Sequence, residues 1–175
     1  MIYQRLLKQF LLILFLSFPI LLVAQTNDYK GRKCFGYEKD SCPNSTNIFY
    51  KVHQSSRSAL FVKGQTSQTP LTIYNGRDYR ISLCWDPILG SQVYFKLIDA
   101  QTGNVLYDNA TNEYASDFEF TVAQTRDIIL EIKVPGSSAL MEAKSNDEII
   151  LVQKDTDMGC LGILIEHMIT PSKGF

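Results

Sequence analysis

The chain has 175 residues, with 17 basic and 18 acidic side chains, four cysteines and two histidines. Its formal net charge of −1 argues against the basic face of a nucleic-acid binder, so we expect no nucleic-acid partner. The sequence contains no serine-nucleophile elbow, zinc-protease motif, phosphate-binding loop or dinucleotide-binding glycine pattern. We therefore do not expect an enzyme, and we assign no catalytic, cofactor-binding or metal-binding residue.

Residues 1–25 have the layout of a secretory signal peptide. Arg5 and Lys8 precede an apolar run, residues 10–24, that is about 15 residues long and broken by Pro19. A membrane-spanning helix needs roughly 20 apolar residues, so an uncleaved anchor is the weaker alternative. We expect a periplasmic or secreted protein of a Gram-negative envelope that keeps no stable membrane span after signal removal.

Residues 26–47 form a polar, irregular lead-in segment that contains Pro43 and two of the cysteines, Cys34 and Cys42. We expect a disulfide to tie this segment down. Residues 48–175 are then predicted to form one β-sandwich domain, because a mature chain of about 150 residues is long enough for one domain with a sizeable core.

The domain region is a series of short segments with alternating apolar and polar residues, each bounded by turn residues, which is typical of antiparallel strands. Residues 139–147 are expected to form a loop or a single helical turn. The pattern predicts an all-β fold, a single antiparallel β-sandwich of about nine or ten strands with a jelly-roll or immunoglobulin-like topology. The predicted strands are 47–52, 58–63, 71–74, 77–85, 92–98, 104–109, 117–122, 126–134, 148–153 and 160–169.

The even number of cysteines in an exported chain indicates disulfides rather than free thiols. Cys84 and Cys160 both point away from the more apolar face of their strands, so neighbouring strands could bring them together. The favoured scheme pairs Cys84 with Cys160 and Cys34 with Cys42, which would stabilise the fold by about 4 and about 2.5 kcal/mol in the chain-entropy model. A scheme that bonds Cys34 and Cys42 each to Cys84 or Cys160 stays open, as do unpaired, buried cysteines.

Aromatic side chains are the remaining indication of a binding surface. Tyr94, Tyr107 and Tyr114 are the candidates, because tyrosine combines apolar area with a polar group, and a cluster of them would suit a carbohydrate or a peptide. His53 directly follows the predicted strand 47–52 and His167 lies in the predicted strand 160–169, without a metal-ligand spacing between them, and we expect both at the surface or rim of the domain.

The segments SRSALFVKGQTS, YNGRDYRISLCWD, LYDN and FEFTV and the ending GCLGILIEHMITPSKGF resemble a family of small exported β-sandwich proteins from bacteria of the Bacteroidota. The resemblance covers about residues 50–175. It implies a fold and a compartment, but it carries over no functional residues, because that family has no established activity. We expect a non-catalytic module that binds another envelope component, a protein or a glycan, or that acts as an accessory subunit. A carbohydrate-binding module or a hydrolytic enzyme of the envelope is the alternative.

Overall fold

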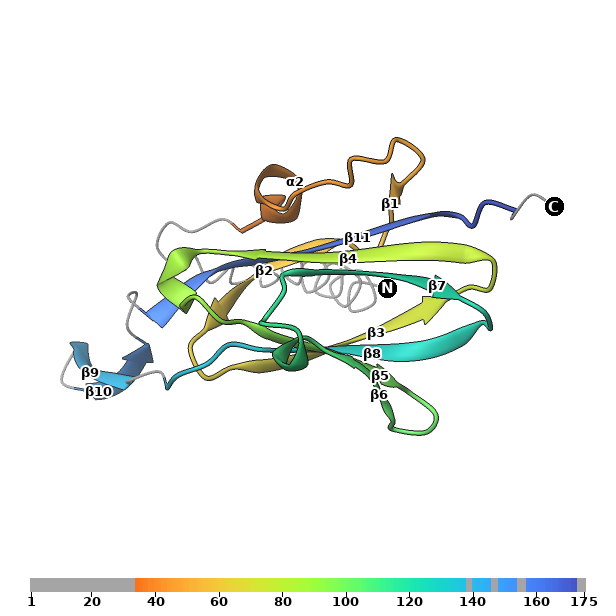
Figure 1. Cartoon of the computed structure of the whole chain (residues 1–175). Coiled ribbons are helices and arrows are strands. Elements are labelled where there is room, and N and C mark those ends of the chain that lie inside the picture. The colour runs from red at the N-terminus through yellow and green to blue at the C-terminus, as the bar shows by residue number, and fades with distance from the viewer. Residues whose placement is uncertain (1–33, 138–139, 146–147, 154–156, 173–175) are drawn as a thin grey trace, which may run out of the picture. The chain divides into compact units, whose positions relative to one another are not determined.

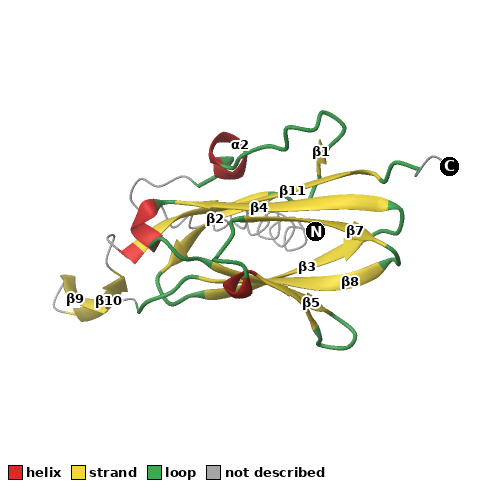
Figure 2. Ribbon diagram, viewed as in Figure 1, coloured by secondary structure: helices red, strands yellow, loops and turns green. Residues whose placement is uncertain are grey.

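The computed structural model describes residues 34–137, 140–145, 148–153 and 157–172, so the predicted signal peptide and the start of the lead-in lie outside the described residues. Two antiparallel sheets stack face to face, which confirms the predicted all-β sandwich (Figure 1). Only short helical segments interrupt the strands (Figure 2). Of the helices in the described part of the chain, none has the length and apolar character needed to cross a bilayer.

The first sheet has the order β1-β11-β4-β7, and β2 pairs with the same edge of β11 as β1 does. The long strand β11 is therefore paired on both edges and runs through the middle of the sheet. The strands are β1 (Lys51–Val52), β2 (Arg57–Val62), β4 (Arg77–Trp85), β7 (Asp117–Val122) and β11 (Met158–Ile169).

Between β1 and β2 the chain leaves the sheet for a short turn, and residues of this turn still hydrogen-bond to the backbone of β11. The hydroxyl of Ser56 accepts a hydrogen bond from Ile165 N and donates one to Ile165 O, both at 3.0 Å. His53 N donates to the same carbonyl at 2.7 Å. β1 and β2 are thus two parts of one edge.

The second sheet has the order β3-β8-β5-β6. Pro70 lies within β3. Proline has no N–H group to donate, but β3 pairs only with β8 among the described strands, so it is an edge strand and can contain a proline. The strands are β3 (Thr66–Ile73), β5 (Tyr94–Asp99), β6 (Val105–Asp108) and β8 (Arg126–Lys133).

The core lies between the two sheets and follows the alternation in the sequence. Ile81 and Leu83 of β4 are at most 2% exposed, as are Ile128 and Leu130 of β8, so the apolar faces of both sheets are buried against each other. Each such side chain stabilises the fold by roughly 1.5–3 kcal/mol.

The structure differs from the predicted strands in three main places. The strand predicted at 71–74 is the longer β3, which begins at Thr66 and continues through Pro70. Residues 140–145 are not a loop but strand β9 (Leu140–Ser145), which pairs with β10 (Glu148–Gln153) across a two-residue connection typical of hairpins. At the other end, the predicted strand 47–52 is reduced to β1. Asn47 causes this change, because its side chain accepts a hydrogen bond from Phe49 N and its carbonyl accepts one from Tyr50 N, which favours a turn.

Candidate functional site

Two disulfides fasten the lead-in to the outer face of the first sheet. They join Cys34 to Cys160 and Cys42 to Cys84. Disulfide bonding is therefore confirmed, but the favoured pairing of Cys34 with Cys42 and of Cys84 with Cys160 is wrong. Cys84 and Cys160 do share a face, yet Cys84 stands opposite Gly162, two residues beyond Cys160. The lead-in crosses above both cysteines and supplies a partner for each.

The helix of the lead-in, α2 (Tyr37–Ser41), packs closely on the sheet because Gly162 has no side chain. A Cβ atom at Gly162 would stand 2.8 Å from Cys84 Sγ and 2.8 Å from Glu38 Cα. The alternation predicts that the outer face of the first sheet is exposed to solvent. In the structure, α2 covers part of this face. Ser82 is 0% exposed and Leu164 is 1% exposed.

A buried ion pair fastens the next part of the lead-in. Arg80 Nη1 lies 2.9 Å from Glu166 Oε2 and donates a hydrogen bond to Pro43 O at 2.7 Å. Ser45 N donates to both carboxylate oxygens of Glu166, at 3.2 and 3.0 Å. Glu119 lies on the other side of Arg80, 3.4 Å from its Nε atom. The chain is therefore held in place up to the residues that form the candidate site.

The main candidate site is a groove of about 610 Å³ near β1 and the end of β11, which we call the β1–β11 groove. The strand register brings its side chains together, because Lys51 stands opposite His167 and Arg77 stands opposite Ile169. The groove is lined by Asn47, Phe49, Lys51, Arg77, His167, Met168, Ile169 and Pro171.

Large apolar side chains at this groove are open to solvent. Phe49 is 70% exposed and Ile169 is 80% exposed. Ile48 and Val52, in the same stretch of chain as Phe49, are also exposed. Exposed apolar residues that occur singly need no explanation, but several beside one concave site indicate an interaction surface.

The charged side chains of the groove are both cationic. Among the described residues that line it, Lys51 and Arg77 face no carboxylate, and neither forms an ion pair within the described chain. The Arg77 guanidinium instead lies 5.8 Å from the centroid of the Tyr74 ring. The groove therefore combines apolar walls with positive charge.

A second histidine contacts His167, which is one of the residues that line the groove. The rings of His53 and His167 contact edge to face, with centroids 5.2 Å apart, and the Tyr79 ring lies behind them. Burial lowers the pKa of both imidazoles, and the charge of Arg77 lowers each further. Both are half-buried, and the sequence spacing could not show that they touch. Within the described residues, no three His, Cys, Asp or Glu side chains are arranged to hold a metal ion.

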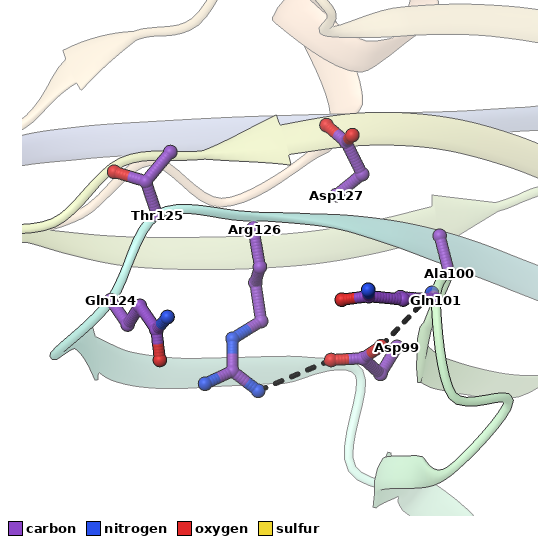
Figure 3. Close-up of a pocket in the computed structure, with 7 residues that line it drawn as sticks. All are labelled: Asp99, Ala100, Gln101, Gln124, Thr125, Arg126 and Asp127. Atoms are coloured by element: carbon purple, nitrogen blue, oxygen red, sulfur yellow. Dashed lines mark hydrogen bonds and ion pairs between the residues drawn. The ribbon is translucent and has the colours of Figure 1, made fainter.

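A second pocket, of about 550 Å³, lies at the ends of β5 and β8 and is polar (Figure 3). Arg126 Nη1 reaches across it to Asp99 Oδ2 at 3.2 Å, while Asp99 Oδ1 accepts hydrogen bonds from the backbone N–H groups of Gln101 and Thr102. Hydrogen bonding from Thr102 is the main reason that the pKa of Asp99 is lowered. Arg126 and Asp99 thus pair with each other, while Asp127 Oδ1 accepts a hydrogen bond from Thr72 Oγ1 at 2.6 Å. Its lining is Asp99, Ala100, Gln101, Gln124, Thr125, Arg126 and Asp127.

The structure brings together two of the three candidate tyrosines. The rings of Tyr94 and Tyr114 meet edge to face with centroids 5.0 Å apart, and both residues are half-buried. Tyr107 is 8% exposed and stacks on Phe118 at 3.7 Å, so its ring packs in the core. A binding role for these tyrosines stays a prediction. Sequence reasoning missed the β1–β11 groove. Ile48 and Phe49 beside the turn-forming Asn47 could have indicated exposed apolar side chains, but not the groove.

Comparison with known proteins gives little further information. No protein-family model and no curated protein matches the chain. Among solved structures, it is similar to a periplasmic inhibitor of g-type lysozyme from Aeromonas hydrophila, with a TM-score of 0.39 and 7% sequence identity. The similarity covers 72% of this chain and 92% of that chain. A likeness this distant carries no argument about function.

Proposed function

We propose that the protein is an exported, non-catalytic β-sandwich module of a Gram-negative envelope and that it binds another envelope component through the β1–β11 groove. Two disulfides are typical of proteins that fold in an oxidising compartment, which supports export. The signal-like layout of residues 1–25 and the resemblance of the sequence to exported Bacteroidota proteins support the same setting.

The observation that carries the proposal is the exposure of Phe49 and Ile169 at the rim of a preformed groove. Aromatic and aliphatic side chains at a concave site are the anchors that commonly dominate binding energy. Leaving them in water is unfavourable by roughly 1.5–3 kcal/mol each relative to full burial, so a partner that covers them gains affinity.

The lead-in makes this surface rigid before any partner arrives. The disulfide at Cys42 and the hydrogen bonds of Pro43 and Ser45 hold the chain only a few residues before Phe49. A preorganised surface loses less conformational entropy on binding than a flexible one. The scaffold therefore suits a binding role.

The lining of the groove favours binding over hydrolysis. A hydrolase with a serine or cysteine nucleophile needs that nucleophile beside a base, and a glycosidase needs paired carboxylates. The described residues that line the groove include none of these nucleophiles or carboxylates, and the four cysteines are held in disulfides.

The experiment is chemical crosslinking in the native envelope, followed by mass spectrometry. The wild type is compared with a Phe49→Ser/Ile169→Ser variant and with a control, Val105→Ser/Leu106→Ser, which removes two exposed apolar side chains from β6. We expect one recurrent crosslinked component with the wild type and the control, and its loss with the groove variant. Equal recovery by the groove variant would contradict the proposal.

A further inference from the structure

We infer that the β1–β11 groove takes an acidic, extended peptide segment of a partner protein, which lies along β1 and directs one apolar side chain and at least one carboxylate to the groove, where Lys51 on β1 and, beyond β11, Arg77 on β4 provide positive charge. This inference rests on the proposed function and names the chemistry of the partner. Three features of the groove support it: its charge, the open edge of β1 and the apolar walls.

The charge of the groove calls for an anionic partner. Lys51 and Arg77 are its charged side chains, and Asp78 and Glu166, which stand next to Arg77 in sequence and opposite Val52 in register, are not among the residues that line it. Glu166 binds Arg80 and Ser45, and Asp78 accepts a hydrogen bond from Thr170 Oγ1 at 2.7 Å. Burial is the main cause of the lowered pKa values of the two histidines, and the charge of Arg77, the second cause, agrees with positive charge at the groove. Carboxylates from outside would complement this potential.

The open edge of β1 calls for an extended chain. β1 pairs only with β11 among the described strands. His53 N points to β11, where it donates to Ile165 O, and backbone groups of an antiparallel strand alternate in direction. The N–H and C=O groups of Val52 therefore face away from β11. A peptide added at such an edge gains main-chain hydrogen bonds, which a lipid tail cannot form.

The apolar walls of the groove favour a peptide that carries an apolar side chain. Phe49 and Ile169 flank the groove, and Met168 adds a flexible, polarizable surface that adapts to different shapes. Successive side chains of an extended peptide point to opposite faces, so an apolar residue that enters the groove shares its face with the residues two positions away, and these can carry the carboxylates. The preferred segment thus places Asp or Glu two positions from an apolar residue.

The test selects peptides from a random dodecapeptide library displayed on phage, with the disulfide-bonded protein as the target. We expect the enriched sequences to combine Leu, Ile, Phe or Trp with Asp or Glu two positions away. A fluorescent peptide of the most enriched sequence should bind at least about tenfold more weakly to Lys51→Glu/Arg77→Glu, because the variant replaces two positive charges at the groove with two negative ones that repel an acidic peptide. It should bind unchanged to Lys133→Glu, a matched control at an exposed lysine at the end of β8.

Other outcomes overturn the inference. Enrichment of basic or uncharged peptides, or equal binding to the charge-reversed variant, would contradict an acidic segment. Binding of laurate or of phosphatidylglycerol vesicles that depends on Lys51 and Arg77, with no peptide enriched, would assign the groove to a lipid. Thermal melting of each variant shows whether it is folded.

The crosslinking experiment separates this inference from the proposed function. If the native crosslink requires Phe49 and Ile169 but survives the reversal of both cations, the groove binds its partner and the acidic segment is wrong. If the crosslink survives Phe49→Ser/Ile169→Ser, both the proposed function and this inference fail.

Discussion

Arg80 and Glu166 face each other across the β4–β11 ladder, nearly buried, with Arg80 Nη1 2.9 Å from Glu166 Oε2. The same two side chains hydrogen-bond to Pro43 and Ser45 of the lead-in. The pair therefore does more than neutralise charge on the sheet. It fixes the path by which the lead-in reaches the β1–β11 groove.

Removing one member of this pair should destabilise the fold. We expect Glu166→Met to lower the free energy of unfolding by about 3 kcal/mol, because Arg80 loses its buried partner while Ser45 loses its acceptor. Urea unfolding measures the change. The double variant Arg80→Met/Glu166→Met should recover part of the loss, because it removes the buried guanidinium, which in the single variant keeps only the more exposed carboxylates of Asp117 and Glu119 as partners. A loss below about 1 kcal/mol, the value of an exposed pair, would contradict the structural role of Glu166.

A tryptic digest without reduction distinguishes the disulfide schemes directly. Cleavage after lysine and arginine places each cysteine in a different peptide, since Lys39 separates Cys34 from Cys42. We expect Cys34–Lys39 linked to Asp155–Lys173, and Asp40–Lys51 linked to Ile81–Lys96. A linked species of Cys34–Lys39 with Asp40–Lys51 would overturn the observed pairing.

The close packing of α2 on the sheet depends on Gly162. Gly162→Ala should cost about 2 kcal/mol of stability, because the new Cβ meets backbone atoms of Glu38, which cannot move aside as a flexible side chain could. Ser82→Ala, on the same face, is the matched control. It removes a buried hydroxyl that has no hydrogen-bond partner within the described chain, so it should be neutral or stabilising. Chemical denaturation measures the free energy of unfolding of both variants. Equal stability of Gly162→Ala and the wild type would refute the close contact.

The paired histidines should make the fold less stable in mild acid. Burial first, and Arg77 second, lower the pKa of His53 and His167 from 6.5, so the unfolded chain binds protons that the folded chain rejects. Stability is then complete above 6.5 and is lost as the pH falls towards the lowered pKa values. Melting between about pH 7.5 and about pH 5.5 should show this slope. A His53→Gln/His167→Gln variant should have a flatter profile, and an identical slope in that variant would argue against the histidines as its source.

The strands could be predicted from the sequence because the alternation in them reports which face is apolar. In RDYRISLCW, Tyr79, Ile81 and Leu83 are buried between the sheets as the pattern indicates. The alternation predicted the wrong structure in two segments. At Asn47 it predicted a strand, but the side chain accepts a backbone hydrogen bond that favours a turn. In residues 140–145 the polar residues led to the prediction of a loop, but this segment is a strand of a hairpin.

The outer face and the groove could not be predicted, because both depend on long-range contacts. Alternation places Cys84 on the face opposite the core, but it cannot show that α2 covers that face or that Cys42 arrives there. It likewise cannot show that Phe49 and Ile169, 120 positions apart, line one groove. Such sites follow from strand register, which sequence patterns specify only within a hairpin.

Binding through the β1–β11 groove is tested most directly with a photoreactive phenylalanine analogue at position 49. Cells that export this variant are illuminated, and the crosslinked species are identified. Binding through the β1–β11 groove predicts a discrete crosslinked species when the analogue is at position 49. This species should be absent when the same analogue replaces Leu106, and it should be lost when Ile169→Ser is added to the position-49 variant. No crosslinked species from position 49, or the same species from both positions, would contradict binding through the β1–β11 groove.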